Sequence, residues 1–163
     1  MRILITGPES SGKSTLARAL AWSLDGIFVA EQARTYLQER DNLYGPADLP
    51  QICQRQLTAE KTFAAPMPSY LVCDTGPEVI YVWSEVKYGQ VAPSVREALR
   101  QVKYDLTLLC APDLPWTYDP QREHPEASDR WKIFERYRIL LPDARIIRGQ
   151  ERTATALRLI TTS

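Results

Sequence analysis

The stretch Gly7-Pro8-Glu9-Ser10-Ser11-Gly12-Lys13-Ser14 decides the fold of this chain. It has the pattern Gly-x-x-x-x-Gly-Lys-Ser, and it lies between an apolar run at 3–5 and a segment at 13–24 with apolar residues at helical spacing. A phosphate-binding loop requires this order of strand, loop and helix, because backbone N–H groups and the positive end of the helix then face one anion. We therefore predict a P-loop domain. The competing interpretation is a chance glycine turn before a helix.

The residues of this loop have separate expected roles. The backbone N–H groups cradle the phosphates, Lys13 reaches the β- and γ-phosphates, and the Ser14 hydroxyl ligates magnesium. We therefore expect ATP and Mg²⁺ as cofactors, although the loop alone does not separate ATP from GTP. The expected nucleotide-binding residues are Gly7, Glu9, Ser10, Ser11, Gly12, Lys13, Ser14 and Thr15.

Length and composition limit the possible partners. The 163 residues are the size of one domain, 1–163, and the 20 basic and 20 acidic side chains cancel, so charge does not indicate a nucleic-acid partner. No apolar stretch approaches a membrane span. The three cysteines lack Cys-x-x-Cys spacing, which argues against disulfides or zinc and favours a cytoplasmic protein. We expect a small-molecule substrate, no nucleic acid and no membrane, and the oligomeric state stays open.

Apolar runs alternate with helical patterns along the chain. We expect strands at 3–5, 27–30, 70–75, 106–111 and 144–147, and helices at 13–24, 49–64, 77–88, 130–141 and 151–161, with shorter helices near 33–37 and from 93. This alternation predicts a three-layer α/β/α P-loop NTPase fold with a five-stranded parallel sheet. Asp48 is expected to cap the helix at 49–64, Phe63 to lie on its inner side, and Val86 to lie on a buried stripe.

Two acidic residues follow predicted strands. Asp74 follows the apolar residues of the run at 70–75 and is the candidate Walker B acid, which ligates magnesium directly or through water. The alternative is an aspartate that serves only as a cap or turn residue. Glu31 and Arg34 follow the strand at 27–30, at the end of the sheet where ligands bind in open α/β folds.

The segment at 112–128 predicts a lid over the nucleotide and the substrate. It contains four prolines and is long for a connection. Arg122 and Arg130 could neutralise charge on a transferred phosphoryl group, or they could be ordinary solvated arginines. The lid favours a small-molecule kinase, and a GTPase would require an Asn-Lys-x-Asp run that is absent. A nucleotide-dependent switch whose lid binds a protein is the alternative from another class.

Segments spread over almost the whole chain resemble the NadR-type ribosylnicotinamide kinase domain, a P-loop small-molecule kinase family annotated among AAA-like ATPases. The segments that carry the resemblance are Gly7 to Thr15, Glu31 to Leu37, Cys73-Asp74-Thr75, Lys87-Tyr88-Gly89, and Tyr104 to Arg122. The resemblance implies that ATP and magnesium are used to phosphorylate the 5′-hydroxyl of nicotinamide riboside in NAD salvage.

The resemblance also implies roles for individual residues. Lys13 and Ser14 would hold phosphates and magnesium, while Asp74 would organise the metal or accept the hydroxyl proton. The residues expected to face the acceptor are Glu31, Arg34, Asp74, Trp116 and Tyr118. The two aromatic residues would stack on the base of the acceptor. The alternative for these two is packing within the lid. Catalysis is expected from Lys13, Asp74, Arg122 and Arg130, and metal binding from Ser14 and Asp74.

This chain departs from the family pattern at three places. Gln32 stands where an aromatic residue often follows the glutamate, and Gly76-Pro77 stands where another acid often follows Asp-Thr. The first strand begins at Arg2, so we expect no adenylyltransferase domain before it. The first two departures leave open a kinase of another nucleoside or of a small alcohol.

Overall fold

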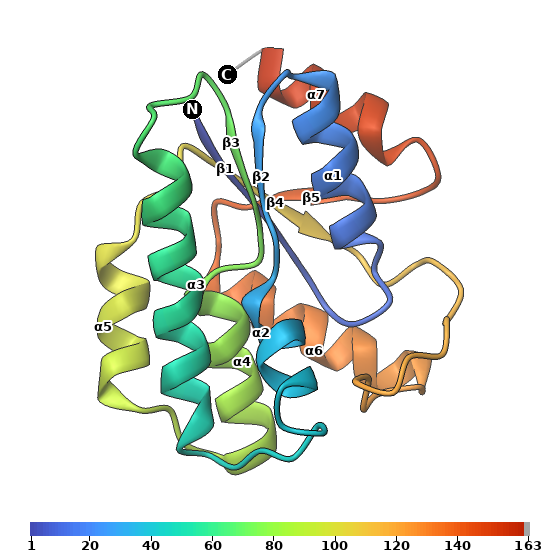
Figure 1. Cartoon of the computed structure of the whole chain (residues 1–163). Helices are drawn as coiled ribbons and strands as arrows, with labels where there is room; N and C mark the ends of the chain where they lie inside the picture. Colours follow the sequence, from blue (N-terminus) through green and yellow to red (C-terminus); the bar gives the residue numbers. More distant parts are fainter. Residues whose placement is uncertain (162–163) are drawn as a thin grey trace.

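Five strands form one sheet in the order β2-β3-β1-β4-β5, and each neighbouring pair runs parallel. The strands are β1 (Arg2–Thr6), β2 (Ile27–Val29), β3 (Leu71–Asp74), β4 (Leu106–Cys110) and β5 (Arg145–Ile147). The helices are α1 (Lys13–Ser23), α2 (Gln32–Gln38), α3 (Asp48–Ala64), α4 (Pro77–Tyr88), α5 (Pro93–Gln101), α6 (Ala127–Leu140) and α7 (Arg152–Thr161). The computed structural model describes residues 1–161 and confirms the predicted three-layer α/β/α fold (Figure 1).

Alternating side chains on the strands build a core on each face of the sheet. Ile3 and Ile5 pack with α1 and α7, whereas Leu4 between them faces the opposite side. On that opposite side, Leu109 packs with α4 and α6, and α3 lies over β2 and β3. Helices α2 to α5 share a further apolar cluster. On this second face, α2, α4 and α6 contribute residues to the same cavity as the P-loop that follows β1.

Three details of the sequence interpretation are wrong. Asp48 is the first residue of α3 and not its cap, because its carboxylate accepts the Gly45 N–H at 2.8 Å and the Tyr36 hydroxyl at 2.5 Å and so closes the preceding turn. Phe63 is 44% exposed instead of facing inward. The helix α6 begins at Ala127 and not at 130, which removes residues 127 and 128 from the lid; the Asp129 carboxylate lies in its first turn, where the helix dipole favours negative charge.

A buried polar cluster explains the glycine that follows Asp74 and Thr75. A Cβ atom at Gly76 would overlap the Tyr104 hydroxyl and would lie 2.7 Å from Oε2 of Glu78. Glu78 is fully buried, and burial raises the pKa of its carboxyl group to about 7. The departure at position 76 therefore follows from packing beneath the strand end. Within residues 1–161, none of the helices has the length and apolar character to cross a membrane.

Candidate active site

A cavity of about 270 Å³ lies where the P-loop meets the second helical face. All residues of the P-loop from Gly7 to Thr15 line one side of this cavity. The remaining walls come from α2, α4 and α6 and from the lid at 121–124. Elements that are distant in sequence therefore enclose one space, which is bounded on one side by the expected phosphate site.

The P-loop backbone has the conformation that its glycines permit. Gly7 and Gly12 have φ values of 142° and 77°, and Ser10 also has a positive φ of 54°. No side chain caps the start of α1 at Lys13. The first N–H groups of this helix are therefore left to bind an anion, and the helix dipole favours the same charge.

Asp74 lies at the end of β3, beside Ile5 of β1, and only 2% of its surface is exposed. Its Oδ1 atom is buried and accepts no hydrogen bond from the described residues. Burial and the negative charge of Glu31 raise the pKa of Asp74, while Lys13 and the Ser14 hydroxyl act in the opposite direction. A free, desolvated carboxylate oxygen next to Ser14 suits a hard cation.

Magnesium at this place would need further ligands. Among residues 1–161 there is no cluster of three or more His, Cys, Asp or Glu side chains that could form a metal cage. Ser14 and Asp74 are therefore the protein groups that fit the ion, with phosphate and water oxygens completing its shell. Mg²⁺ typically binds in this way at nucleotide sites.

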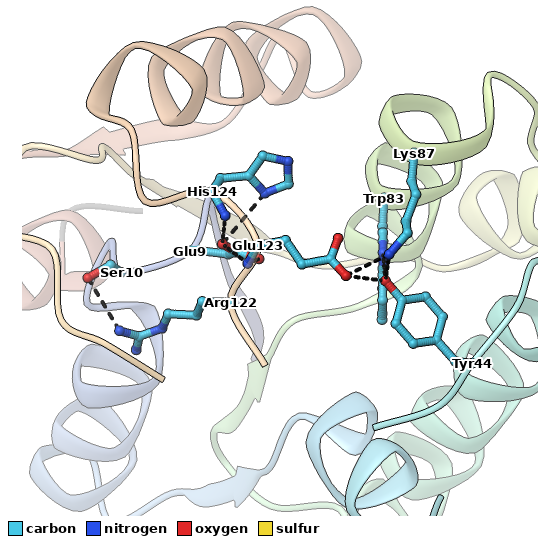
Figure 2. A network of polar contacts seen from close by, with 8 residues as sticks. All are labelled: Glu9, Ser10, Tyr44, Trp83, Lys87, Arg122, Glu123 and His124. Atoms are coloured by element: carbon cyan, nitrogen blue, oxygen red, sulfur yellow. Dashed lines mark hydrogen bonds and ion pairs between the residues drawn. The ribbon is translucent and has the colours of Figure 1, made fainter. Parts of the chain in front are cut away.

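Two P-loop side chains hold the lid. The Glu9 carboxylate accepts the backbone N–H groups of Glu123 at 3.0 Å and of His124 at 2.9 Å, and it lies 3.6 Å from Nδ1 of His124 (Figure 2). Burial raises the pKa of Glu9, but the hydrogen bonds from the lid outweigh burial and lower it below the usual value. The Ser10 hydroxyl oxygen accepts the Thr117 N–H at 3.0 Å. Lid and phosphate loop are thus held together by direct contacts.

Of the two predicted catalytic arginines, Arg122 lies in the lid and Arg130 lies in the helix α6 that follows it. Arg122 lines the cavity and its Nη1 is 3.4 Å from the Ser10 hydroxyl. Arg130 is 4% exposed and is not among the cavity-lining residues. The guanidinium carbons of Arg122 and Arg130 lie 5.7 Å and 5.4 Å from the centre of the Trp116 ring. Trp116 therefore contacts both arginines. It belongs to the lid but does not line the cavity. Tyr118, the other aromatic residue of the lid, is 82% exposed and does not line the cavity either.

The wall opposite the P-loop combines apolar, aromatic and charged groups. Glu31, the residue before α2, and Arg34 of α2 line it, and Arg34 Nη1 lies 2.9 Å from the carboxylate of Asp119 in the lid. The Val86 side chain on α4 is 42% exposed and lines the cavity, so its assignment to a buried stripe is wrong. Trp83 of α4 and Tyr137 of α6 are the aromatic side chains of the lining.

Sequence reasoning did not assign several cavity residues to the site. These are Pro8, Ala33, Leu37, Val79, Val82, Trp83, Val86, Lys87, Gln121, Glu123, His124, Ile133 and Tyr137. The spacing of the α4 residues is the same for a helix that faces a core and for one that faces a cavity, so periodicity could not separate the two. The run of charged residues at 122–124 in the lid was the signal that could have identified Glu123 and His124.

Comparisons with known proteins agree with the fold. The profile of a family described as an AAA domain, AAA_28, matches residues 2–148. The search of curated proteins gives no match. Among solved structures, NadR in complex with NAD and AMP-PNP has a TM-score of 0.80 at 22% identity, covering 99% of this chain and 48% of that chain.

Two further solved structures are similar. NadR in complex with NR has a TM-score of 0.78 at 22% identity, covering 99% of this chain and 50% of that chain. Deoxyadenosine kinase from M. mycoides with bound dATP has a TM-score of 0.59 at 13% identity, and the match covers 99% of each chain. This chain therefore spans about half the length of the NadR chains. The resemblance to the NadR-type domain is confirmed at the level of the fold, and the chain belongs to the AAA_28 family of AAA domains.

Proposed function

We propose that this protein is an ATP-dependent kinase that phosphorylates the 5′-hydroxyl of nicotinamide riboside. The observation that carries the proposal is the single cavity in which the P-loop faces an acceptor wall made of acidic, aromatic and apolar side chains. The fold shared with NadR supports it, because those structures contain AMP-PNP in one case and NR in the other.

The donor nucleotide is held by the P-loop in this proposal. Backbone N–H groups from Gly7 to Thr15 and the Lys13 ammonium bind the phosphate oxygens, and Arg122 approaches them from the lid. Ser14 and Asp74 would hold magnesium. When bound, the ion would neutralise part of the charge on the β- and γ-phosphates. The unpartnered Oδ1 of Asp74 supports this role for the carboxylate.

Glu31 is the better candidate for the general base. It lines the cavity, whereas Asp74 does not and is almost completely buried. In the proposed step the 5′-hydroxyl oxygen forms a bond to the γ-phosphorus, and the bond from that phosphorus to the β–γ bridging oxygen breaks. ADP leaves and the hydroxyl proton moves to the Glu31 carboxylate, which later releases it to solvent.

The aromatic wall supports a cationic acceptor ring. Trp83 and Tyr137 belong to the acceptor wall of the cavity, and the nicotinamide ring of the riboside is cationic. An aromatic face attracts such a cation by about 0.5–2 kcal/mol per ring. We therefore propose that Trp83 and Tyr137 contact the base, and that Trp116 positions Arg122 and Arg130. Tyr118 can reach the base only if the lid changes conformation.

A panel of acceptors tests the function. The purified protein is incubated with magnesium and ATP or GTP, and with ribosides, deoxyribosides and small alcohols, while ADP or GDP and the phosphorylated product are followed. The expected result is rapid phosphorylation of nicotinamide riboside with ATP. Phosphorylation of another acceptor alone would favour the second candidate, a different nucleoside kinase, which Gln32 and the fold of deoxyadenosine kinase support. Slow hydrolysis that no acceptor accelerates would contradict both and favour a switch.

A further inference from the structure

Two side chains donate to the carboxylate of Glu123, and a third donates to one of these two. The Lys87 ammonium and the Tyr44 hydroxyl both donate to its Oε1 atom at 2.6 Å, and the Trp83 indole N–H donates to the Tyr44 oxygen at 3.1 Å (Figure 2). The rings of Tyr44 and Trp83 also pack edge to face with centres 4.8 Å apart. The orientation of the Glu123 carboxylate is therefore fixed from the α4 side.

This arrangement keeps one acceptor and one donor available in the cavity. Oε2 of Glu123 accepts no hydrogen bond from the described side chains or backbone. Lys87 uses two of its three N–H groups, one for Glu123 and one for Tyr44. Both Lys87 and Glu123 line the cavity, and their side chains are 35% and 39% exposed. A carboxylate oxygen and an ammonium N–H therefore lie side by side at the acceptor wall.

Tyr44 and Lys87 both keep their protons near neutral pH. Burial and the hydrogen bond to Glu123 raise the pKa of Tyr44 to about 12, so its hydroxyl remains a donor to the carboxylate. Burial lowers the pKa of Lys87, but its hydrogen bonds to Glu123 and Tyr44 outweigh burial and raise it. Lys87 is thus an ammonium, and its ion pair with Glu123 at 2.6 Å carries no net charge. Such a pair favours a neutral polar group over an anion or a cation.

The lid also fixes how far this pair lies from the phosphate loop. The N–H of Glu123 itself binds Glu9 in the P-loop, while its side chain extends to Lys87 on α4 (Figure 2). One residue therefore connects the donor nucleotide site with the acceptor wall. A ligand group at the Lys87–Glu123 pair would be held at a set distance from the transferred phosphoryl group.

We propose that the Lys87–Glu123 pair recognises the vicinal diol of the acceptor's sugar and selects ribosides over deoxyribosides. One hydroxyl donates to Oε2 of Glu123, and its neighbour accepts an N–H from Lys87. Two adjacent hydroxyls match the adjacent acceptor and donor. This inference rests on the proposed function, and it names the sugar feature that the site requires.

The test compares nicotinamide riboside with its 2′-deoxy and 3′-deoxy forms, and adenosine with the same two changes. Loss of one hydroxyl is expected to lower kcat/KM roughly 10- to 100-fold, because a polar group that is built to bind it is left unpaired. Glu123→Gln keeps the shape of the side chain but replaces one acceptor oxygen by an amide donor. It is expected to lower kcat/KM for the riboside by a similar factor and to reduce the riboside to deoxyriboside ratio toward one. Lys87→Met is expected to have the same effect on the other hydroxyl.

Glu39→Gln is the matched control. Glu39 forms an exposed ion pair with Arg55 at 2.7 Å and does not line the cavity, so the ratio should not change. Equal losses for riboside and deoxyriboside in Glu123→Gln would overturn the inference and leave Glu123 as a lid contact only. If no acceptor is phosphorylated, the proposed function fails. Calorimetric binding of the same ligands with a non-hydrolysable ATP analogue then still decides whether the pair distinguishes a diol.

Discussion

The two halves of the cavity are built in different ways. The donor half, formed by residues 7–15, is continuous in sequence and presents mainly backbone N–H groups, and Asp74 lies buried next to Ser14 outside the lining. The acceptor half, formed by α2, α4, α6 and lid residues 121–124, presents side chains from four separate elements. The difference implies that the donor half tolerates little change, whereas the acceptor half can be altered to accept other substrates within the same fold.

Loss of Lys13 should have the largest effect. Lys13→Ala removes the ammonium expected at the β- and γ-phosphates, where charge develops during transfer, so kcat should fall about 10³-fold or more. Steady-state kinetics measures this loss, and the thermal unfolding midpoint should remain close to that of the parent protein. A variant with more than a tenth of the parent activity would show that the donor half does not depend on this residue.

The contrast between Asp74 and Glu31 should separate metal binding from base catalysis. Asp74→Asn should lower kcat by about 10²- to 10³-fold and raise the magnesium concentration needed for half-maximal rate, while ATP still binds. Glu31→Gln should lower kcat by about 10²-fold or more without changing the magnesium requirement. Magnesium titrations of both variants provide the measurement. If the magnesium requirement shifted only in Glu31→Gln, the two roles would be reversed.

The donor half could be predicted from the sequence because its chemistry depends on one local pattern. The glycines and Lys13-Ser14 indicate the loop, and the apolar run before Asp74 places that acid at a neighbouring strand end. The order of the elements likewise predicted the parallel sheet, because a chain in which strands and helices alternate can form few sheet topologies. The helix and strand ends lie within one residue of their predicted positions, except the start of α6 at Ala127, which differs by three.

The acceptor half could not be predicted to the same extent. Val86 and Trp83 have the spacing of core residues, and only tertiary packing shows that α4 borders a cavity. Glu123 acts together with Lys87 and Tyr44, which lie 36 and 79 positions away in sequence. Contacts of this kind depend on the path of the lid, for which local sequence contains no periodic signal.

Removal of Arg122 should have an intermediate effect, because this side chain borders the P-loop from the lid. Arg122→Ala should lower kcat by about 10- to 100-fold and change the affinity for ATP less, since a cation that approaches the transferred group acts mainly as charge develops. Separate measurement of kcat and of ATP binding by calorimetry tests this. Arg138→Ala is a suitable control because it loses only an exposed pair with Glu135 on α6. Equal losses in affinity and rate for Arg122→Ala would indicate a ground-state role.

The smallest expected effect concerns the contact between His124 of the lid and Glu9 of the P-loop. The nearby Glu9 carboxylate raises the pKa of His124, the single histidine of the chain, with smaller contributions from Glu123 and Asp129. A raised folded-state pKa means that the ion pair contributes fully to stability below the ordinary histidine pKa of about 6.5. This contribution is lost as the pH rises through the higher folded value. Because both side chains are 27% exposed, it should amount to less than about 1 kcal/mol.

The measurement is the difference in unfolding free energy between the parent protein and His124→Asn from pH 5.5 to 8.5. The difference is needed because burial also raises the pKa of Asp74 and Glu78, so both acids contribute to the pH dependence of either protein near neutrality. The parent should be more stable than the variant at low pH, and the two should converge as the pH rises. The backbone N–H groups of residues 123 and 124 still bind Glu9 when the imidazole is neutral, so the lid should stay attached at high pH. A difference that is independent of pH would mean that His124 contributes only packing, and that the two halves of the cavity are joined by Glu9 through the lid backbone alone.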